Sequence, residues 1–168
     1  CACLVGSEMC IRDRDYTSFY LCDLANDTME TIKQSVHSNW AEIDGMTELK
    51  SGYTSRIRYY YDHYVIRESA PDFLQKMERH ALIEYLRNHK RFAYRYQSVK
   101  NHAGHEYFEL QVIRLETGNR DDYKIIMGFR YIDDIVQEDM KKKQQMEETM
   151  ADLKMNNETV SYTHLRAH

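Results

Sequence analysis

Residues 91–135 constrain the fold most strongly, because they combine three consecutive β-strand patterns with a charged helical pattern that follows at once. The expected strands are residues 92–97, 107–112 and 123–131. In each of them apolar or aromatic side chains recur at every second position, which places them on one face of a sheet. The connections between them are short and contain Gly104 and Gly118. Short connections favour antiparallel pairing, so the sequence predicts a three-stranded meander.

A further hairpin and several helical segments precede the meander. Residues 19–24 and 28–32 have strand-forming composition and flank an Ala-Asn-Asp turn. Apolar spacings of three and four predict a helix that begins near Thr54. A second helix is expected to start at Pro71 and end near Asn88, because proline is well suited to the first helical position.

Together these elements predict an α+β fold, in which a five-stranded antiparallel sheet carries helices on one face and a C-terminal helix follows. Between the hairpin and the first helix, residues 35–52 are polar and are expected to be irregular. The expected anchors in that stretch are Trp40, Ile43 and Leu49.

Length and charge exclude several classes of protein. The chain has 168 residues and is 42% hydrophobic, which is enough for one domain with a core. The formal net charge of -4 argues against a nucleic-acid partner. Because no apolar run approaches the ~20 residues of a membrane span, none is expected in this stretch.

Both ends of the chain differ from the rest. Residues 1–14 show no sustained periodicity, and they and residues 160–168 resemble translated sequencing-adapter read-through, which recurs at the ends of unrelated metagenomic fragments. We therefore expect residues 1–14 and 158–168 to be non-native or disordered tails, with the natural protein continuing past both ends; natural disordered tails are the alternative. Outside these tails Cys22 is the one cysteine, which fits a reducing, cytoplasmic location.

The segment after the meander follows a heptad pattern. Its apolar positions are Ile132, Val136, Met146, Met150 and Leu153, and Asp139 and Lys143 occupy two positions of the same register. A seam of this kind drives helices to pair, and its polar members weaken the pairing. We expect a parallel dimer seam through Val136, Met146, Met150 and Leu153. The alternative is one amphipathic helix that packs on its own domain.

Tyrosine is abundant, with 14 residues in the chain. Tyr60, Tyr64, Tyr94 and Tyr96 come from the expected helix and the meander, and they offer apolar bulk with a hydrogen-bonding tip. They are candidates for a pocket that binds a polar small molecule. Aromatic residues at structural periods more often pack a core, and that alternative is favoured.

Four segments, in this order, resemble the PAS domain family. They are APDF at 70–73, FAYRY at 92–96, IIMGFRYID at 125–133 and DIV at 134–136. They are similar to the family's HPDD segment, the strand that enters its meander, its last strand and its DIT exit motif. Ala70 stands where the family usually has histidine, and Val136 where it has threonine. The resemblance covers roughly residues 16–153 and is greatest to bacterial PAS domains that precede diguanylate cyclase or histidine kinase modules.

The resemblance implies a sensory and dimerisation module in two-component or cyclic-di-GMP signalling. Residues 15–134 would form the sensor domain, and residues 135–157 the signalling helix. Asp134, Ile135 and Val136 would transmit the signal to a covalently linked effector that is missing from this chain. A stand-alone small-molecule binding protein with a tyrosine-rich pocket is the alternative.

No catalytic residues are expected, because the chain has no Gly-Gly pair for a cyclase signature loop and no glycine-rich nucleotide box. His102 and His105 lie in an expected turn without a third ligand, so no metal site is expected. His80 and His89 lie on or just after the expected helix before the meander, and His80 is off its apolar stripe, so haem ligation is not indicated. Cys22 does not match a flavin-linked cysteine. The cofactor, if the protein uses one, is unknown.

Overall fold

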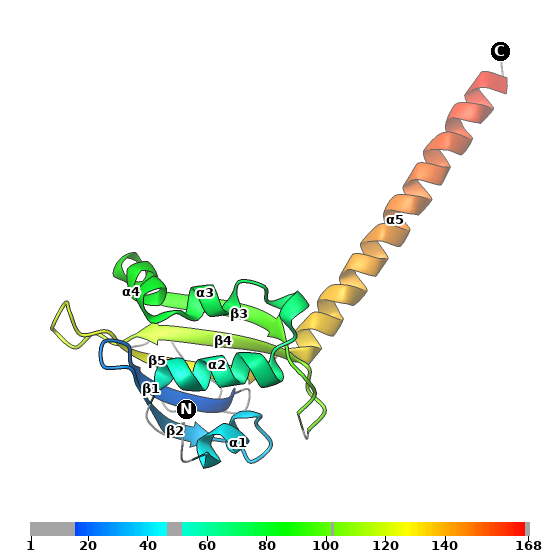
Figure 1. Cartoon of the computed structure of the whole chain (residues 1–168). Coiled ribbons are helices and arrows are strands. Elements are labelled where there is room, and N and C mark those ends of the chain that lie inside the picture. The colour runs from blue at the N-terminus through cyan, green and yellow to red at the C-terminus, as the bar shows by residue number, and fades with distance from the viewer. Residues whose placement is uncertain (1–15, 47–51, 102, 167–168) are drawn as a thin grey trace. The chain divides into compact units, whose positions relative to one another are not determined.

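In the computed structural model the alternating segments pair into one antiparallel sheet of five strands (Figure 1). The strands are β1 Tyr16–Asp23, β2 Thr28–Gln34, β3 Arg91–Gln97, β4 Tyr107–Arg114 and β5 Lys124–Tyr131. Their order across the sheet is β2-β1-β5-β4-β3, and every neighbouring pair is antiparallel. The predicted meander is confirmed, and the N-terminal hairpin extends it beside β5.

The structure describes residues 16–46, 52–101 and 103–166. The chain divides into two units, Cys1–Ile132 and Asp133–His168. The expected boundary between residues 134 and 135 lies close to this division.

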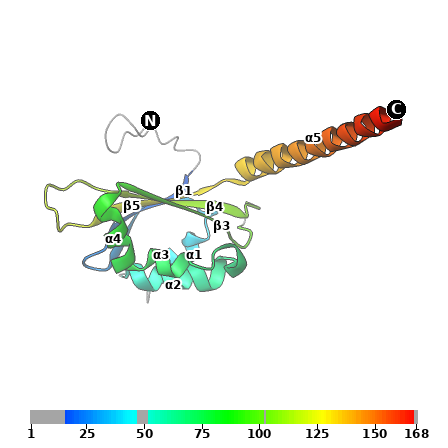
Figure 2. The same cartoon turned by 90° about the horizontal axis from the view of Figure 1, so that it is seen from above.

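The helices of the first unit lie on one side of the sheet, as Figure 2 shows. They are α1 Trp40–Gly45, α2 Tyr53–Tyr64, the 3-10 helix η2 Arg67–Ser69, α3 Phe73–Met77 and α4 Arg79–Asn88. The predicted fold class, an α+β fold with a PAS-like arrangement, is therefore what the structure has.

The core lies between these helices and the sheet. Its strand residues alternate as predicted: Phe108, Leu110 and Val112 of β4 and Ile125, Met127 and Phe129 of β5 are all buried in one cluster. Burial of such apolar surface contributes ~25 cal/mol per Å² and is the main force that holds the helices on the sheet.

The single helix predicted from Pro71 to Asn88 is wrong, because the structure breaks it at Glu78. Glu78 has extended backbone angles, φ -60° and ψ 136°, and its carboxylate accepts a hydrogen bond of 3.0 Å from the Ala81 amide. The carbonyl of Met77 accepts a 2.8 Å bond from the Tyr53 hydroxyl instead of a helical amide. The interruption lets α3 and α4 each direct their own apolar residues into the core.

The stretch expected to be irregular contains a short helix, α1. Trp40 and Ile43 are buried in it as expected, whereas Leu49 lies outside the described residues. With six residues, α1 offers too few apolar positions for a periodic pattern to be recognised in the sequence.

The second unit is the helix α5, Asp133–Arg166, which is longer than the predicted helix at 135–157. Residues 158–166 are helical in the structure rather than disordered, because no proline or glycine follows Gly128 to end the helix. Residues 1–14 lie outside the described part, and the read-through origin of both ends stays a prediction. No helix in the described part of the chain has the length and apolar character needed to cross a membrane.

Candidate functional site

Aromatic side chains fill the space between the helices and the sheet. The Trp40 ring stacks on Tyr60 of α2, with 4.5 Å between centroids, and lies 4.8 Å from the Phe129 ring of β5. Tyr60 and Tyr96 are 1% and 4% exposed, and their hydroxyl oxygens are 2.7 Å apart. The two hydroxyl groups therefore form a hydrogen bond with each other inside the core.

Burial also keeps both phenols protonated. It raises the pKa of Tyr60 to about 12, against the lowering effect of hydrogen bonds with Tyr96 and Ser98. Burial likewise raises the pKa of Tyr96 well above its ordinary value. The pair thus stays neutral and donates and accepts hydrogen bonds without charge.

Tyr64 and Tyr94 lie at the rim of this interior. The Tyr64 hydroxyl donates to the Glu42 carboxylate, and the Tyr94 hydroxyl donates to Asp72. The Lys76 ammonium lies 2.8 Å from the same Asp72 carboxylate. The four candidate tyrosines are thus divided between core and rim, and a ligand pocket formed by them stays a prediction.

A hollow of about 400 Å³ lies elsewhere, between the end of α4 and the β4–β5 connection. Residues 86–90 and 114–120 line it. Arg114 holds its two sides together, because its guanidinium donates to the carbonyls of Leu86 at 3.2 Å and Arg120 at 3.0 Å. The Arg114 guanidinium is therefore engaged by backbone carbonyls and clamps the loop junction that forms the hollow.

A buried ion pair joins α1 to α2. The Arg56 guanidinium contacts the Asp44 carboxylate, and their side chains are 4% and 12% exposed. Asp44 also accepts hydrogen bonds from the hydroxyls of Tyr20 at 3.0 Å and Thr31 at 3.2 Å. Arg56 donates to the Met29 carbonyl at 2.9 Å. One charged pair therefore ties both helices to the β1–β2 hairpin.

A second charged cluster lies on the other face of the sheet and is centred on Glu109. Glu109 alternates with the core residues of β4 and is in register with Arg95 of β3 and Arg130 of β5. Its carboxylate accepts bonds of 2.7 Å from Arg95 and of 3.0 and 2.7 Å from Arg130. Gln111 donates a further 2.7 Å bond. Three strands are therefore cross-linked near the point where β5 leaves the sheet.

The charge balance of this cluster makes it sensitive to pH. Burial alone would raise the pKa of Glu109, but hydrogen bonds from Arg95, Gln111 and Arg130 outweigh it and lower that pKa below its ordinary value. A carboxylate with a lowered folded-state pKa stabilises the protein above its unfolded-state pKa. That contribution is lost as the pH falls through the folded-state value.

Glu109→Gln is expected to lower the free energy of unfolding by about 1–3 kcal/mol near pH 7, because two guanidinium groups lose the negative charge that they share. The difference from the parent should shrink below about pH 4. Thermal unfolding of both chains across this pH range checks it. Glu116→Gln is the matched control, because Glu116 pairs with Lys90 at an exposed site. A difference that is the same at every pH would contradict the prediction.

A single residue, Ile132, joins β5 to α5. Ile132 is buried, and its amide donates a 2.8 Å bond to the Tyr107 carbonyl at the start of β4. Just before it, the Tyr131 ring stacks on His105 with 3.8 Å between centroids. Asp133 and Asp134 then form the acidic first turn of α5, where negative charge faces the favourable end of the helix dipole.

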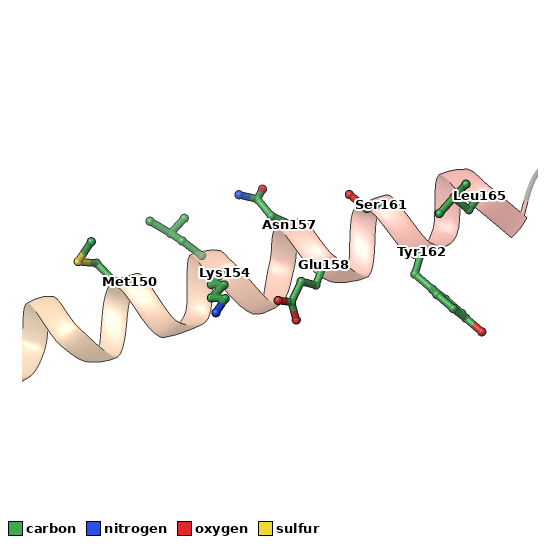
Figure 3. Close-up of a pocket in the computed structure, with 8 residues that line it drawn as sticks. Met150, Lys154, Asn157, Glu158, Ser161, Tyr162 and Leu165 are labelled. Carbon is green, nitrogen blue, oxygen red and sulfur yellow. The ribbon is translucent and has the colours of Figure 1, made fainter.

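The predicted seam residues lie on α5, and the helix as described has no buried residue. Met146, Met150 and Leu153 are 65%, 64% and 59% exposed. An open strip runs from Met150 to Leu165, and in Figure 3 Met150 and Asn157 project from the same side of the helix. The predicted seam residues thus lie on one continuous helix, and their pairing stays a prediction.

No family model, curated protein or solved structure matches this chain. What it does must therefore be inferred from its own residues.

Sequence patterns missed the two charged clusters at Asp44 and Glu109. Each depends on residues that are distant in the sequence and become neighbours only when strand register and helix positions are set. In residues 16–46, 52–101 and 103–166, no three histidine, cysteine, aspartate or glutamate side chains gather as a metal ion would require. His102, half of the pair considered in the sequence, lies outside the described residues. Cys22 is buried in the core, and burial raises the pKa of its thiol strongly.

Proposed function

We propose that this chain is a sensory and dimerisation module of a bacterial signalling protein of the PAS type. Its exit helix would carry a change in the sheet to a diguanylate cyclase or histidine kinase effector in the cytoplasm. The observation that carries the proposal is the junction of the two units. β5 passes through the single residue Ile132 into a helix of 34 residues that buries none of them.

The position of β5 supports this role. It is the central strand and pairs with β1 on one side and β4 on the other. Its Arg130 binds Glu109, so β3 and β4 are tied to the strand that leads to α5. A change in sheet packing would therefore reach the exit through charged and backbone contacts together. The filled aromatic interior gives less support to the alternative, a stand-alone protein that binds a small molecule among the tyrosines.

Asp134→Ala tests the transmission step in a protein that carries an effector. We expect effector output to stop responding to the sensor, because the acidic first turn helps fix the start of α5 by ~0.3–1 kcal/mol. Circular dichroism should show an unchanged sheet. Glu138→Ala, one turn further along α5, is the control for a lost surface carboxylate. An unchanged response in Asp134→Ala would reject Asp134, Ile135 and Val136 as the transmission element.

Self-association of α5 is tested by placing charges on the seam. Met146→Glu together with Met150→Glu is expected to make the chain monomeric, because like charges would face each other where apolar side chains should pair. Sedimentation equilibrium over a concentration series measures the mass. Glu substitutions at Gln144 and Gln145, which lie off the seam, are the matched control. If the doubly charged seam variant associates as the parent does, α5 does not mediate dimerisation.

A further inference from the structure

The heptad register of α5 continues beyond the apolar residues of the predicted seam. In the pattern abcdefg, Val136, Lys143 and Met150 occupy position a, and the next a position is Asn157. Figure 3 places Asn157 on the same side of α5 as Met150. An asparagine therefore lies in line with the apolar seam, at a position that a partner helix would cover.

Asparagine at an a position selects one alignment of a two-stranded coiled coil, because its amide needs a polar partner when it is covered. In a parallel pair with both copies aligned, Asn157 faces the Asn157 of the second copy. A shift by one heptad would place it opposite Met150. An antiparallel pair would place it opposite a d residue such as Leu153. Of these three arrangements, only the aligned parallel pair places a second asparagine amide opposite the Asn157 amide.

The charges beside the seam agree with this alignment. Lys142 occupies position g, and Glu147 occupies position e of the following heptad. In an aligned parallel pair, the g residue of one helix faces this e residue of the other. Lys142 already pairs with Glu138 of its own helix at 2.8 Å, so it is held on that edge of α5. Two Lys142–Glu147 contacts between copies would therefore attract.

We propose that the partner of α5 is a second copy of this chain, bound parallel and in register, with Asn157 and the Lys142–Glu147 pairs fixing the alignment. The inference rests on the self-association in the proposed function and adds its register. The apolar and polar seam positions from Val136 to Asn157 span the three heptads that a coiled coil needs. In this register Asp139 and Lys143 each face their own copy in the second chain, so these like charges keep the pairing weak.

The decisive experiment mixes two charge-reversed chains. Lys142→Glu alone and Glu147→Lys alone each make both contacts repulsive in a homodimer, whereas the mixed dimer has two attractive contacts. We expect each variant's homodimer Kd to rise roughly 2- to 30-fold, the effect of losing two exposed ion pairs. Native mass spectrometry of the mixture should show the mixed dimer well above its statistical fraction.

Asn157→Val provides a second measurement, and its neighbour provides the control. Removing the polar layer is expected to tighten association roughly tenfold and to admit other registers or higher oligomers. Asn156→Val, at position g, should leave the mass and Kd close to those of the parent.

The outcomes separate this inference from the proposed function. A dimeric parent whose charge-reversed variants show no mutual preference would overturn the register and leave self-association standing. The register would equally be rejected if Asn157→Val associated no more tightly than Asn156→Val. A parent chain that is monomeric at every concentration would overturn both the register and the self-association.

Discussion

Trp40→Ala is expected to lower the free energy of unfolding by about 3–5 kcal/mol, the range for removing a large aromatic side chain from a core. Trp40 is 1% exposed and joins three elements, because its ring packs on Tyr20 of β1, Tyr60 of α2 and Phe129 of β5. Alanine would leave a cavity that the short helix α1 cannot close by itself. Urea unfolding followed by circular dichroism measures the loss, which corresponds to a fall in Tm on the order of 10 °C.

Tyr85→Ala is the control for this measurement. Tyr85 is also aromatic, but it is 42% exposed on α4, so its removal should cost much less. If Trp40→Ala lost no more stability than Tyr85→Ala, α1 would not be anchored through its tryptophan.

Arg56→Met is expected to destabilise the chain by about 2–4 kcal/mol, because it leaves the Asp44 carboxylate without its cation in a largely buried site. Adding Asp44→Asn should recover part of the loss. The amide oxygen can still accept from Tyr20 and Thr31, and the uncompensated charge is gone. Urea unfolding of the single and double variants measures both values and gives their coupling.

A matched surface pair shows whether burial is the cause. Lys90→Met breaks the contact between Lys90 and Glu116, whose side chains are 84% and 75% exposed. It should change the free energy of unfolding by less than about 1 kcal/mol. A double variant that is less stable than Arg56→Met alone would contradict the assignment of the cost to the stranded carboxylate.

The strands could be predicted from the sequence because their evidence is local. Alternation along residues 107–112 and 123–131 is enough to define the buried faces of β4 and β5. The break at Glu78 could not be predicted, since it depends on the Tyr53 hydroxyl reaching the Met77 carbonyl from another helix. A helical pattern interrupted by one residue keeps nearly the same apolar spacing, so periodicity alone does not reveal the break.

The candidate site was predictable to a similar extent. The apolar positions of α5 follow from spacing within one helix, as does the acidic first turn at Asp134, while pairing through them stays a prediction. The Glu109 cluster does not, because a glutamate and two arginines on separate strands resemble ordinary surface residues until the register brings them together. The tyrosines were recognised as a group, but their division into a buried pair and two rim residues depends on how the helices pack.

The placement of Trp40 has a practical consequence for spectroscopy. It is the single tryptophan of the chain, and it lies in the interior against β5. Indole fluorescence therefore reports on one site, and α5, which contains no tryptophan, does not contribute to it. Emission wavelength and quenching would follow events between helices and sheet, while pairing of α5 is followed by mass. Changes in the packing of the core and the proposed self-association of α5 can thus be followed separately in the unlabelled protein.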